Sequence, residues 1–362
     1  MIDDYNGLKN CRLTVRWPYC KIQSAIRFQI LERTETEGGP AGPPFLQIKG
    51  RSLKPFLTYE QQLHKLIDEK HLVINNREFA EEKLCDIGYF ALIGGYKEPF
   101  QDAMTRVYLD NTTFEDIYAL YDFDNKLREL IFRYICQIEK KMRNVISYSF
   151  CEVYGEAQAE YLDTSNYNYV RRNQHGIDKL IRMLEGLALT NTDYDYIVHQ
   201  REVYQNVPLW VVINAMTFGQ ISKMYSFLTS KIQSRISKNF KRVNERELEQ
   251  YLKVLVLYRN VCAHNERLFS HKVYSEIPNT VLHSKLHITQ AGSQYKQGKK
   301  DLFGVVIAFR YLLPTDSFLQ FKRNLVLLID KYVRNSSRIT ETELLEQMGF
   351  PENWKLITRY RM

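Results

Sequence analysis

The sequence lacks the patterns that mark a disulfide framework, a zinc site or a membrane segment. Its cysteines are at positions 11, 20, 85, 136, 151 and 262, and no two of them form a Cys-x-x-Cys pair. Thiols scattered in this way are typical of a reducing compartment. No run of about 18 apolar residues occurs, and the N-terminus shows no signal-peptide pattern. We therefore expect a cytoplasmic protein with no membrane partner and no metal site.

Glycine-rich phosphate loops and internal repeats are also missing. Strand-like runs are few, and the clearest are Val273-Tyr274 and Leu286-His287-Ile288, within a polar stretch at 271–300. This shortage of strands argues against a parallel-sheet enzyme, and no cofactor is expected. The fold class predicted from these absences is mainly α, with at most a short β-hairpin.

The composition is ordinary except for its aromatic residues and its charge. Hydrophobic residues make up 44% and charged residues 25% of the 362 positions, whereas tyrosine occurs 25 times and tryptophan only 3 times. Tyrosines at helical spacing mostly belong to a core, although they can also stack on bases. The net charge of +8 suits a polyanionic partner but does not prove one.

Three regions differ in texture along the chain. Residues 1–50 form an N-terminal appendage that ends in a Gly/Pro linker at 38–44, where a helix cannot continue. Residues 51–275 carry sustained helical periodicity and form the predicted core. Residues 276–362 form a predicted C-terminal helical extension that packs on this core.

Helical periodicity and capping residues predict the individual helices. Thr58 begins a helix running to about Ile74, and Thr113 with two following acids begins a helix that lasts to about Tyr154, which is long enough to be the spine of a bundle. Further helices are expected near 78–87, 174–190, 193–205, 209–216, 218–229, 231–240, 245–263, 299–313, 315–334 and 340–348.

The end of the helix at 245–263 carries the densest polar pattern. Among the eight histidines, only His264 has an arginine five to seven positions upstream, Arg259. That spacing alone is a weak signal in a chain of this size. It is strengthened by Asn260 directly after the arginine and by the polar residues that follow, Asn265, Glu266 and Arg267.

This combination suits the cleavage of RNA by its own 2′-hydroxyl group. Imidazole titrates near neutral pH and can accept or donate the required proton. A guanidinium stays charged and binds phosphate oxygens with two donors. The chemistry needs no metal ion, so Arg259 and His264, with Asn260 orienting them, are the predicted catalytic residues.

Helix geometry favours a site made by two copies of the chain. Residues five apart are separated by roughly 140° around a helix axis, so Arg259 and His264 share a face only if the helix frays or bends near Cys262. A single histidine also cannot be acid and base in one turnover. Two copies related by a twofold axis would supply both groups, which predicts a homodimer with a composite cleft. A purely structural interpretation instead gives Arg259 a buried ion pair and places His264 as a cap on the helix dipole.

The segment 259–269, RNVCAHNERLF, resembles the Arg-x4-6-His signature of HEPN-type ribonucleases. The chain is also similar to the bacterial abortive-infection (Abi-like, AbiD/AbiF-type) branch of that superfamily. The similarity rests on five blocks in the family's order: KPFLTYEQQLHKLIDEKHLVI, IGYFALIGGY, TTFEDIYALYDFDNKLRELI, IEKKMRNVISY and VPLWVVINAMTFGQISKMY. It covers roughly residues 52–275.

The resemblance implies a HEPN-type helical bundle with additional helices, a homodimer, and RNA binding or cleavage in phage defence or in a toxin–antitoxin-like system. The signature residues fall on Arg259, Asn260 and His264. The matching block at 138–148 implies that Glu139 and Arg143 support the site, although a surface pair at this spacing is nearly as good an explanation. The residues expected to bind RNA are Arg267, Asn265, Arg143, Lys140 and Lys141.

Three functions remain open at this point. The first is a metal-independent endoribonuclease acting in phage defence. The second is a non-catalytic protein that holds a structured small noncoding RNA in the same cleft. The third is a protein-interaction scaffold, for which the positive charge is incidental. Loss of cleavage with retained RNA affinity in a His264→Ala variant would identify the first.

Overall fold

The computed structural model describes residues 54–336 and 338–360, and this part of the chain is mainly helical, as predicted. The chain divides at Phe56 into two units, and the elements considered below belong to the second, Leu57–Met362. The predicted appendage at 1–50, with its linker, lies outside the described residues. No helix in the described ranges is long and apolar enough to cross a membrane.

The spine of this unit is α4 (Phe114–Tyr154), a helix of 41 residues that is roughly 60 Å long. Thr113 caps it as predicted: its hydroxyl accepts from the Asp116 N–H, and the Asp116 carboxylate accepts from the Thr113 backbone. The helix ends before Gly155, where φ is +96°. Its buried positions recur at helical spacing over its whole length, so it is packed on by other helices throughout.

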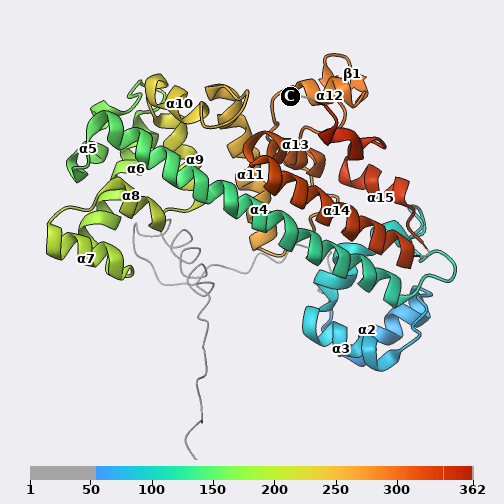
Figure 1. The fold of residues 1–362 in the computed structure, drawn as a ribbon. Coiled ribbons are helices and arrows are strands. Elements are labelled where there is room, and N and C mark those ends of the chain that lie inside the picture. Colours follow the sequence, from blue (N-terminus) through green and yellow to red (C-terminus); the bar gives the residue numbers. More distant parts are fainter. Residues whose placement is uncertain (1–53, 337, 361–362) are drawn as a thin grey trace, which may run out of the picture. The chain divides into compact units, whose positions relative to one another are not determined.

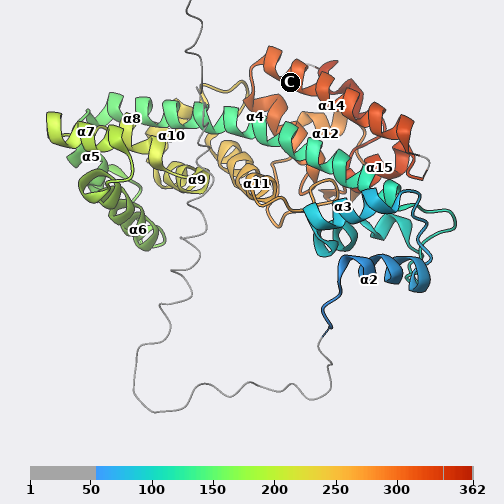
Figure 2. The ribbon, with the colours of Figure 1, turned by 90° about the horizontal axis from the view of Figure 1, so that it is seen from below.

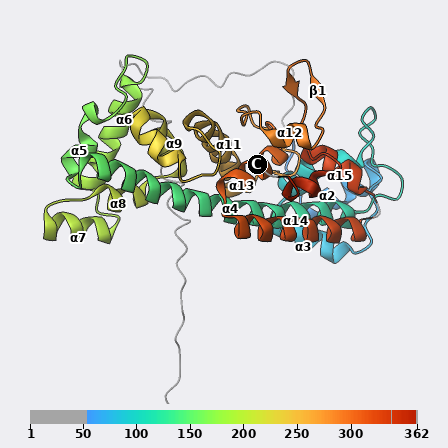
Figure 3. The same ribbon diagram turned by 45° about the horizontal axis from the view of Figure 1, so that its top comes forward.

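Helix α14 (Thr315–Asn335) lies beside the N-terminal half of α4, and the three views of the ribbon agree on this (Figures 1, 2 and 3). Aromatic rings make the contact: Phe123 and Tyr332 have ring centroids 4.8 Å apart, and those of Tyr134 and Phe321 are 5.1 Å apart. Such pairs add about 0.5–1.5 kcal/mol each beyond the burial of their area. The C-terminal helices therefore share a core with the spine.

The middle of the chain surrounds the C-terminal half of α4 (Figure 1). Helix α11 (Glu245–Ala263) crosses the spine at its centre and has the bounds predicted from sequence. The other elements here are α5 (Gln158–Leu162), α6 (Gln174–Glu185), α7 (Asp195–Tyr204), α8 (Leu209–Val212), α9 (Phe218–Phe227) and α10 (Ser230–Ser237).

The N-terminal helices pack at the other end of α4. Helix α2 (Tyr59–His64) begins at the predicted cap, Thr58, and continues as a π-helical turn only to Glu69. The prediction of a helix to Ile74 was wrong, because His71 adopts a positive φ of 56°. The backbone of Val73 instead donates to the Thr112 carbonyl and accepts from the Phe114 N–H at the start of α4. Helix α3 (Arg77–Ile87) follows, and two further short turns span Phe90–Gly94 and Glu98–Phe100.

The C-terminal part contains α12 (Val281–Lys285), α13 (Leu302–Leu312), α15 (Glu341–Met348) and a final turn at Trp354–Thr358. Its strands, β1 (Gln290–Ala291) and β2 (Gln294–Tyr295), form a small antiparallel hairpin. The hairpin was predicted, but neither strand-like run forms it. Val273 bonds to the Lys300 carbonyl in a loop, and Leu286 ends α12.

A buried histidine in this region is hydrogen-bonded through both of its ring nitrogens. His283 accepts from the Thr280 N–H through Nδ1 and donates from Nε2 to the Gly298 carbonyl. Burial lowers its pKa to about 4, so it is neutral when folded. Beside it, burial raises the pKa of Asp301, which accepts from the N–H groups of Gly298 and Gly304, to about 6.

The titrations of His283 and Asp301 are expected to have opposite effects on the stability of the fold between pH 6.5 and 4. The unfolded chain binds the histidine proton first, so acid removes stability through His283, whereas Asp301 binds its proton more readily when folded and adds stability. The change in the free energy of unfolding between pH 7 and pH 5 should therefore be about 2 kcal/mol more favourable to the folded state in His283→Gln than in wild type. Urea unfolding of both proteins at the two pH values measures this. Parallel profiles would show that His283 is not neutral in the fold.

Candidate functional site

The segment singled out by sequence lies at a well-defined helix end. Helix α11 is capped by Asn244, whose side chain accepts from the Glu247 N–H, and it stays helical to Ala263. Its C-terminus is closed by Asn265, which adopts a left-handed φ of 54°, and by a bond from the Glu266 N–H to the Val261 carbonyl. This is the Schellman arrangement, in which asparagine is one of the few residues that fit. The polar cluster is thus held by backbone geometry.

Arg259 is half-buried on α11 and has no acidic partner. Its guanidinium carbon lies 6.0 Å from the centre of the Phe132 ring on α4. Within the described ranges it makes no ion pair and no hydrogen bond, and its Nε is fully enclosed. The ion pair of the structural interpretation is therefore not formed with any described residue. A partly enclosed cation without a counter-charge is suited to an anionic ligand.

His264 occupies the C-cap position of α11 and is exposed, and Asn260, one turn earlier, is exposed as well. Neither side chain hydrogen-bonds to another described residue. The His264 N–H donates to the Asn260 carbonyl at 2.9 Å, so the helix does not fray near Cys262. Arg259 and His264 consequently leave the helix in directions roughly 140° apart. His264 thus has the position of a cap, but its imidazole remains available.

A buried carboxylate on α4 fixes the loop that follows His264. Asp124 is fully buried and accepts from the backbone N–H groups of Leu268 at 2.8 Å and Phe269 at 2.7 Å. The Tyr96 hydroxyl donates to it at 2.7 Å and Arg128 at 2.7 Å. Burial raises the pKa of this carboxyl, and the four donors act against that rise. Asp124 therefore ties the loop after α11 to the spine.

Arg128 completes this cluster. It is almost fully buried and donates from Nη1 to the carbonyl of Glu266 at 3.2 Å, in addition to Asp124 and the Tyr96 hydroxyl. Its other terminal nitrogen donates to the Asn125 side chain. The guanidinium thus joins the spine to the loop two residues after His264. Asp124, Arg128 and Tyr96 are positioning residues that sequence reasoning missed.

A signal for them exists in the sequence. Asp124 occupies a position in the apolar pattern of α4, between Tyr121 and Leu127, and Arg128 follows one turn later. An acid in a buried stripe with a base four residues on is the pattern of a buried ion pair. What it holds, the loop at 266–269, lies 144 residues away in sequence and could not be inferred.

The predicted supporting pair, Glu139 and Arg143, forms an ion pair on α4, and Arg143 also donates to the Met216 carbonyl at 2.8 Å. Both side chains, like Arg259, lie within electrostatic range of the Cys136 thiol on α4. Burial is the main cause that raises the pKa of the Cys136 thiol, Glu139 raises it further, and Arg259 and Arg143 lower it. The charges of Glu139, Arg143 and Arg259 therefore all act on the same turn of α4.

The residues predicted to bind RNA fall in two places. At the end of α11, Asn265 is exposed, whereas Arg267 donates to the Gly95 carbonyl at 3.1 Å and pairs with Glu98 at 3.2 Å. Farther along the spine, Lys140 is exposed, and Lys141 donates to the Asn239 carbonyl with its amine 4.1 Å from the Phe240 ring centre. Arg267 and Lys141 therefore have structural partners, whereas the side chains of Asn265 and Lys140 hydrogen-bond to none of the residues that the structure describes.

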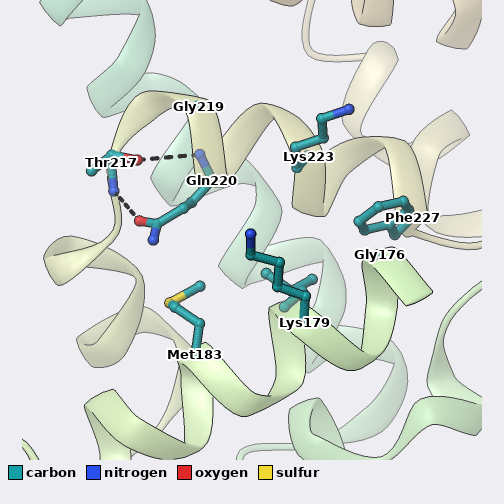
Figure 4. Close-up of a pocket in the computed structure, with 9 residues that line it drawn as sticks. Gly176, Lys179, Met183, Thr217, Gly219, Gln220, Lys223 and Phe227 are labelled. Carbon is teal, nitrogen blue, oxygen red and sulfur yellow. Dashed lines mark hydrogen bonds between the residues drawn. The ribbon is translucent and has the colours of Figure 1, made fainter. Parts of the chain in front are cut away.

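A separate hollow of about 480 Å³ lies between α6 and α9. Figure 4 shows Lys179 and Met183 reaching from α6 towards α9, with Phe227 against Gly176. The hydrogen bonds drawn there belong to the cap of α9, Thr217 with Gln220. Its walls are mostly apolar, and none of the residues predicted from sequence lines it. In the described part of the chain, no three His, Cys, Asp or Glu side chains are grouped to hold a metal ion.

A model of the family described as Abi-like protein matches residues 82–270. The match begins within α3 and ends just after the loop held by Asp124, so it contains every residue of the predicted site and of the cluster that anchors it. Comparison with curated proteins gave no match, and comparison with solved structures gave none.

Proposed function

Because the chain belongs to the Abi-like protein family, we propose that it is an RNA-directed phage-defence protein of the AbiD/AbiF type, in the HEPN superfamily, and that it is a metal-independent endoribonuclease. The observation that carries this proposal is Arg259, a half-buried cation without an acidic partner in the described structure, five residues before an exposed histidine. The fixed C-terminal end of α11 supports the proposal, since a catalytic side chain has to be held in position by a rigid backbone.

In the proposed reaction, His264 of one copy takes the proton of an RNA 2′-hydroxyl, and the oxygen attacks the adjacent phosphorus. Arg259 binds the phosphate oxygens as negative charge grows on them. The bond to the 5′-oxygen of the next nucleotide breaks, and this oxygen receives a proton from His264 of the second copy. The products are a 2′,3′-cyclic phosphate and a free 5′-hydroxyl.

The homodimer follows from the same chemistry. The helix is intact to Ala263, so one copy presents Arg259 and His264 in different directions and supplies only one imidazole. Two copies that meet through the ends of their α11 helices would bring two imidazoles to one phosphate. We place the protein in the cytoplasm, where its RNA targets are.

The test is cleavage without metal ions. Wild type and His264→Ala would be purified from phage-challenged cells, and the RNA recovered with each would be incubated with each protein in EDTA. We expect cleavage by wild type alone, with 2′,3′-cyclic phosphate ends, because the His264 imidazole carries the proton transfers of the proposed reaction. RNA recovered specifically but cut by neither protein would identify a non-catalytic RNA-binding protein. No RNA association at moderate salt would favour an interaction scaffold.

A further inference from the structure

A hollow of about 450 Å³ on the spine has the chemistry of a nucleotide site. Helix α4 contributes Lys140, Lys141 and Arg143 to its lining, and α8 contributes Trp210. The rest of the lining is neutral, and none of it is acidic. Cations beside an aromatic face bind a phosphate and a base together, which an apolar peptide or a lipid tail does not require.

Trp210 is the most informative residue in this hollow, which we call the α4–α8 groove. Trp210 is 49% exposed, whereas Trp354, in the C-terminal region, is fully buried. An exposed indole has a free face on which a base can stack, and such stacking contributes about 1–3 kcal/mol per base. Tyr196 of α7 is exposed nearby. The rise in its pKa caused by burial and by Tyr194 is opposed by the charge of Arg143.

The cations of the groove differ in how far they are neutralised. Lys140 is exposed and makes no ion pair or hydrogen bond to any residue in the described ranges. Arg143 is paired with Glu139, and Lys141 is turned towards the Asn239 carbonyl and Phe240. One acid therefore stands against three cations, and Lys140 is the group best placed to meet a phosphate.

The groove and Arg259 lie along the same face of α4. Phe132, beneath Arg259, Cys136 and Lys140 succeed one another at four-residue spacing, so they lie along one face of α4. The distance along the axis from Phe132 to Lys140 is roughly 12 Å. Arg143 and Arg259 both act on the thiol of Cys136, which lies between these two ends. A strand bound at one end is directed towards the other.

We propose that the α4–α8 groove binds a nucleotide of single-stranded RNA next to the phosphate held by Arg259, with its base on Trp210 and its phosphate on Lys140. This inference rests on the proposed function, since it assigns the path of the RNA that His264 would cleave. A duplex does not fit the scheme, because its bases are already stacked on one another and cannot reach the indole.

The test compares full-length Trp210→Ala, Trp210→Phe and Lys140→Ala with wild type and with His264→Ala, the variant expected not to cleave RNA. The probe is a fluorescein-labelled single-stranded oligoribonucleotide of mixed sequence, and binding is followed by anisotropy in EDTA over a range of salt concentrations. In the His264→Ala background, Trp210→Ala should weaken binding roughly tenfold or more, and Trp210→Phe much less. Lys140→Ala should reduce the salt slope by about 1.

Matched controls distinguish an effect of the groove from the effect of replacing any exposed aromatic or basic side chain. Tyr274 is 82% exposed in a loop, and Lys331 is exposed on α14, so Tyr274→Ala and Lys331→Ala should leave affinity unchanged. RNA that contains 4-thiouridine should also cross-link to the tryptic peptide that contains Trp210. Circular dichroism establishes that each variant is folded.

The outcomes distinguish this inference from the proposed function. The groove would be overturned, and the ribonuclease left intact, if wild type binds RNA, folded Trp210→Ala binds it equally well, and no cross-link forms at Trp210. Weakened binding in Trp210→Ala together with no cleavage by wild type would support the groove and overturn the ribonuclease. No RNA binding by wild type would overturn both.

Discussion

Asp124→Ala is expected to lower the free energy of unfolding by about 3–5 kcal/mol, the usual cost of removing one partner of a buried ion pair. The substitution leaves the guanidinium of Arg128 buried without its counter-charge. It also leaves the backbone N–H groups of Leu268 and Phe269 without an acceptor. Urea unfolding followed by circular dichroism measures the loss.

Asp122→Ala is the matched control, two residues away on the same helix. Asp122 forms an ion pair with Lys126 in which both side chains are about two-fifths exposed, so its removal should cost no more than about 1 kcal/mol. An Asp124→Leu, Arg128→Met double variant should recover part of the stability, because no unpaired charge remains in the core. Equal losses for Asp122→Ala and Asp124→Ala would show that Asp124 does not anchor the loop.

Arg259→Ala is expected to lower the rate of RNA cleavage by about 10²–10³-fold, the usual effect of removing one donor that stabilises a transition state. Stability should change little, because Arg259 has no ion pair to lose among the described residues, and its contact with Phe132 contributes about 0.5–1 kcal/mol. Rates under single-turnover conditions in EDTA, with unfolding curves for the same samples, measure both effects.

Arg259→Lys keeps the charge but not the two parallel donors, so its rate should lie between wild type and Arg259→Ala. Arg246→Ala is the control on the same helix, since Arg246 is exposed in the first turn of α11, far from its C-terminal end. A large loss of stability in Arg259→Ala with an unchanged rate would assign Arg259 a purely structural role.

Local signals in the sequence were sufficient for most of the helices. Thr113 with Asp116 determines where α4 begins, and Asn244 with Glu247 does the same for α11, because these caps need only residues three positions apart. The segment from Arg259 to His264 was recognised for the same reason: its pattern is contained within six residues. The family match then covers the same segment.

The features that sequence reasoning missed all depend on distant parts of the chain. His71 adopts a positive φ and ends its helix, because Val73 forms a parallel β-bridge with Thr113. The groove needs α8 to bring Trp210 against residues of α4 that lie about 70 positions earlier. Periodicity assigns a buried face to each helix but does not identify the helix that covers it, so these contacts could not be predicted.

The bonds from Leu268 and Phe269 to Asp124 determine when during synthesis the candidate site can exist. They join residues 144 positions apart, so the end of α11 is not held on α4 until Leu268 has been made. At ribosomal speeds of about 5–20 residues per second, Asp124 is synthesised roughly 7–29 seconds before Leu268. Under the proposed function, a nascent chain that stops short of this loop is therefore expected not to cleave the message from which it is translated.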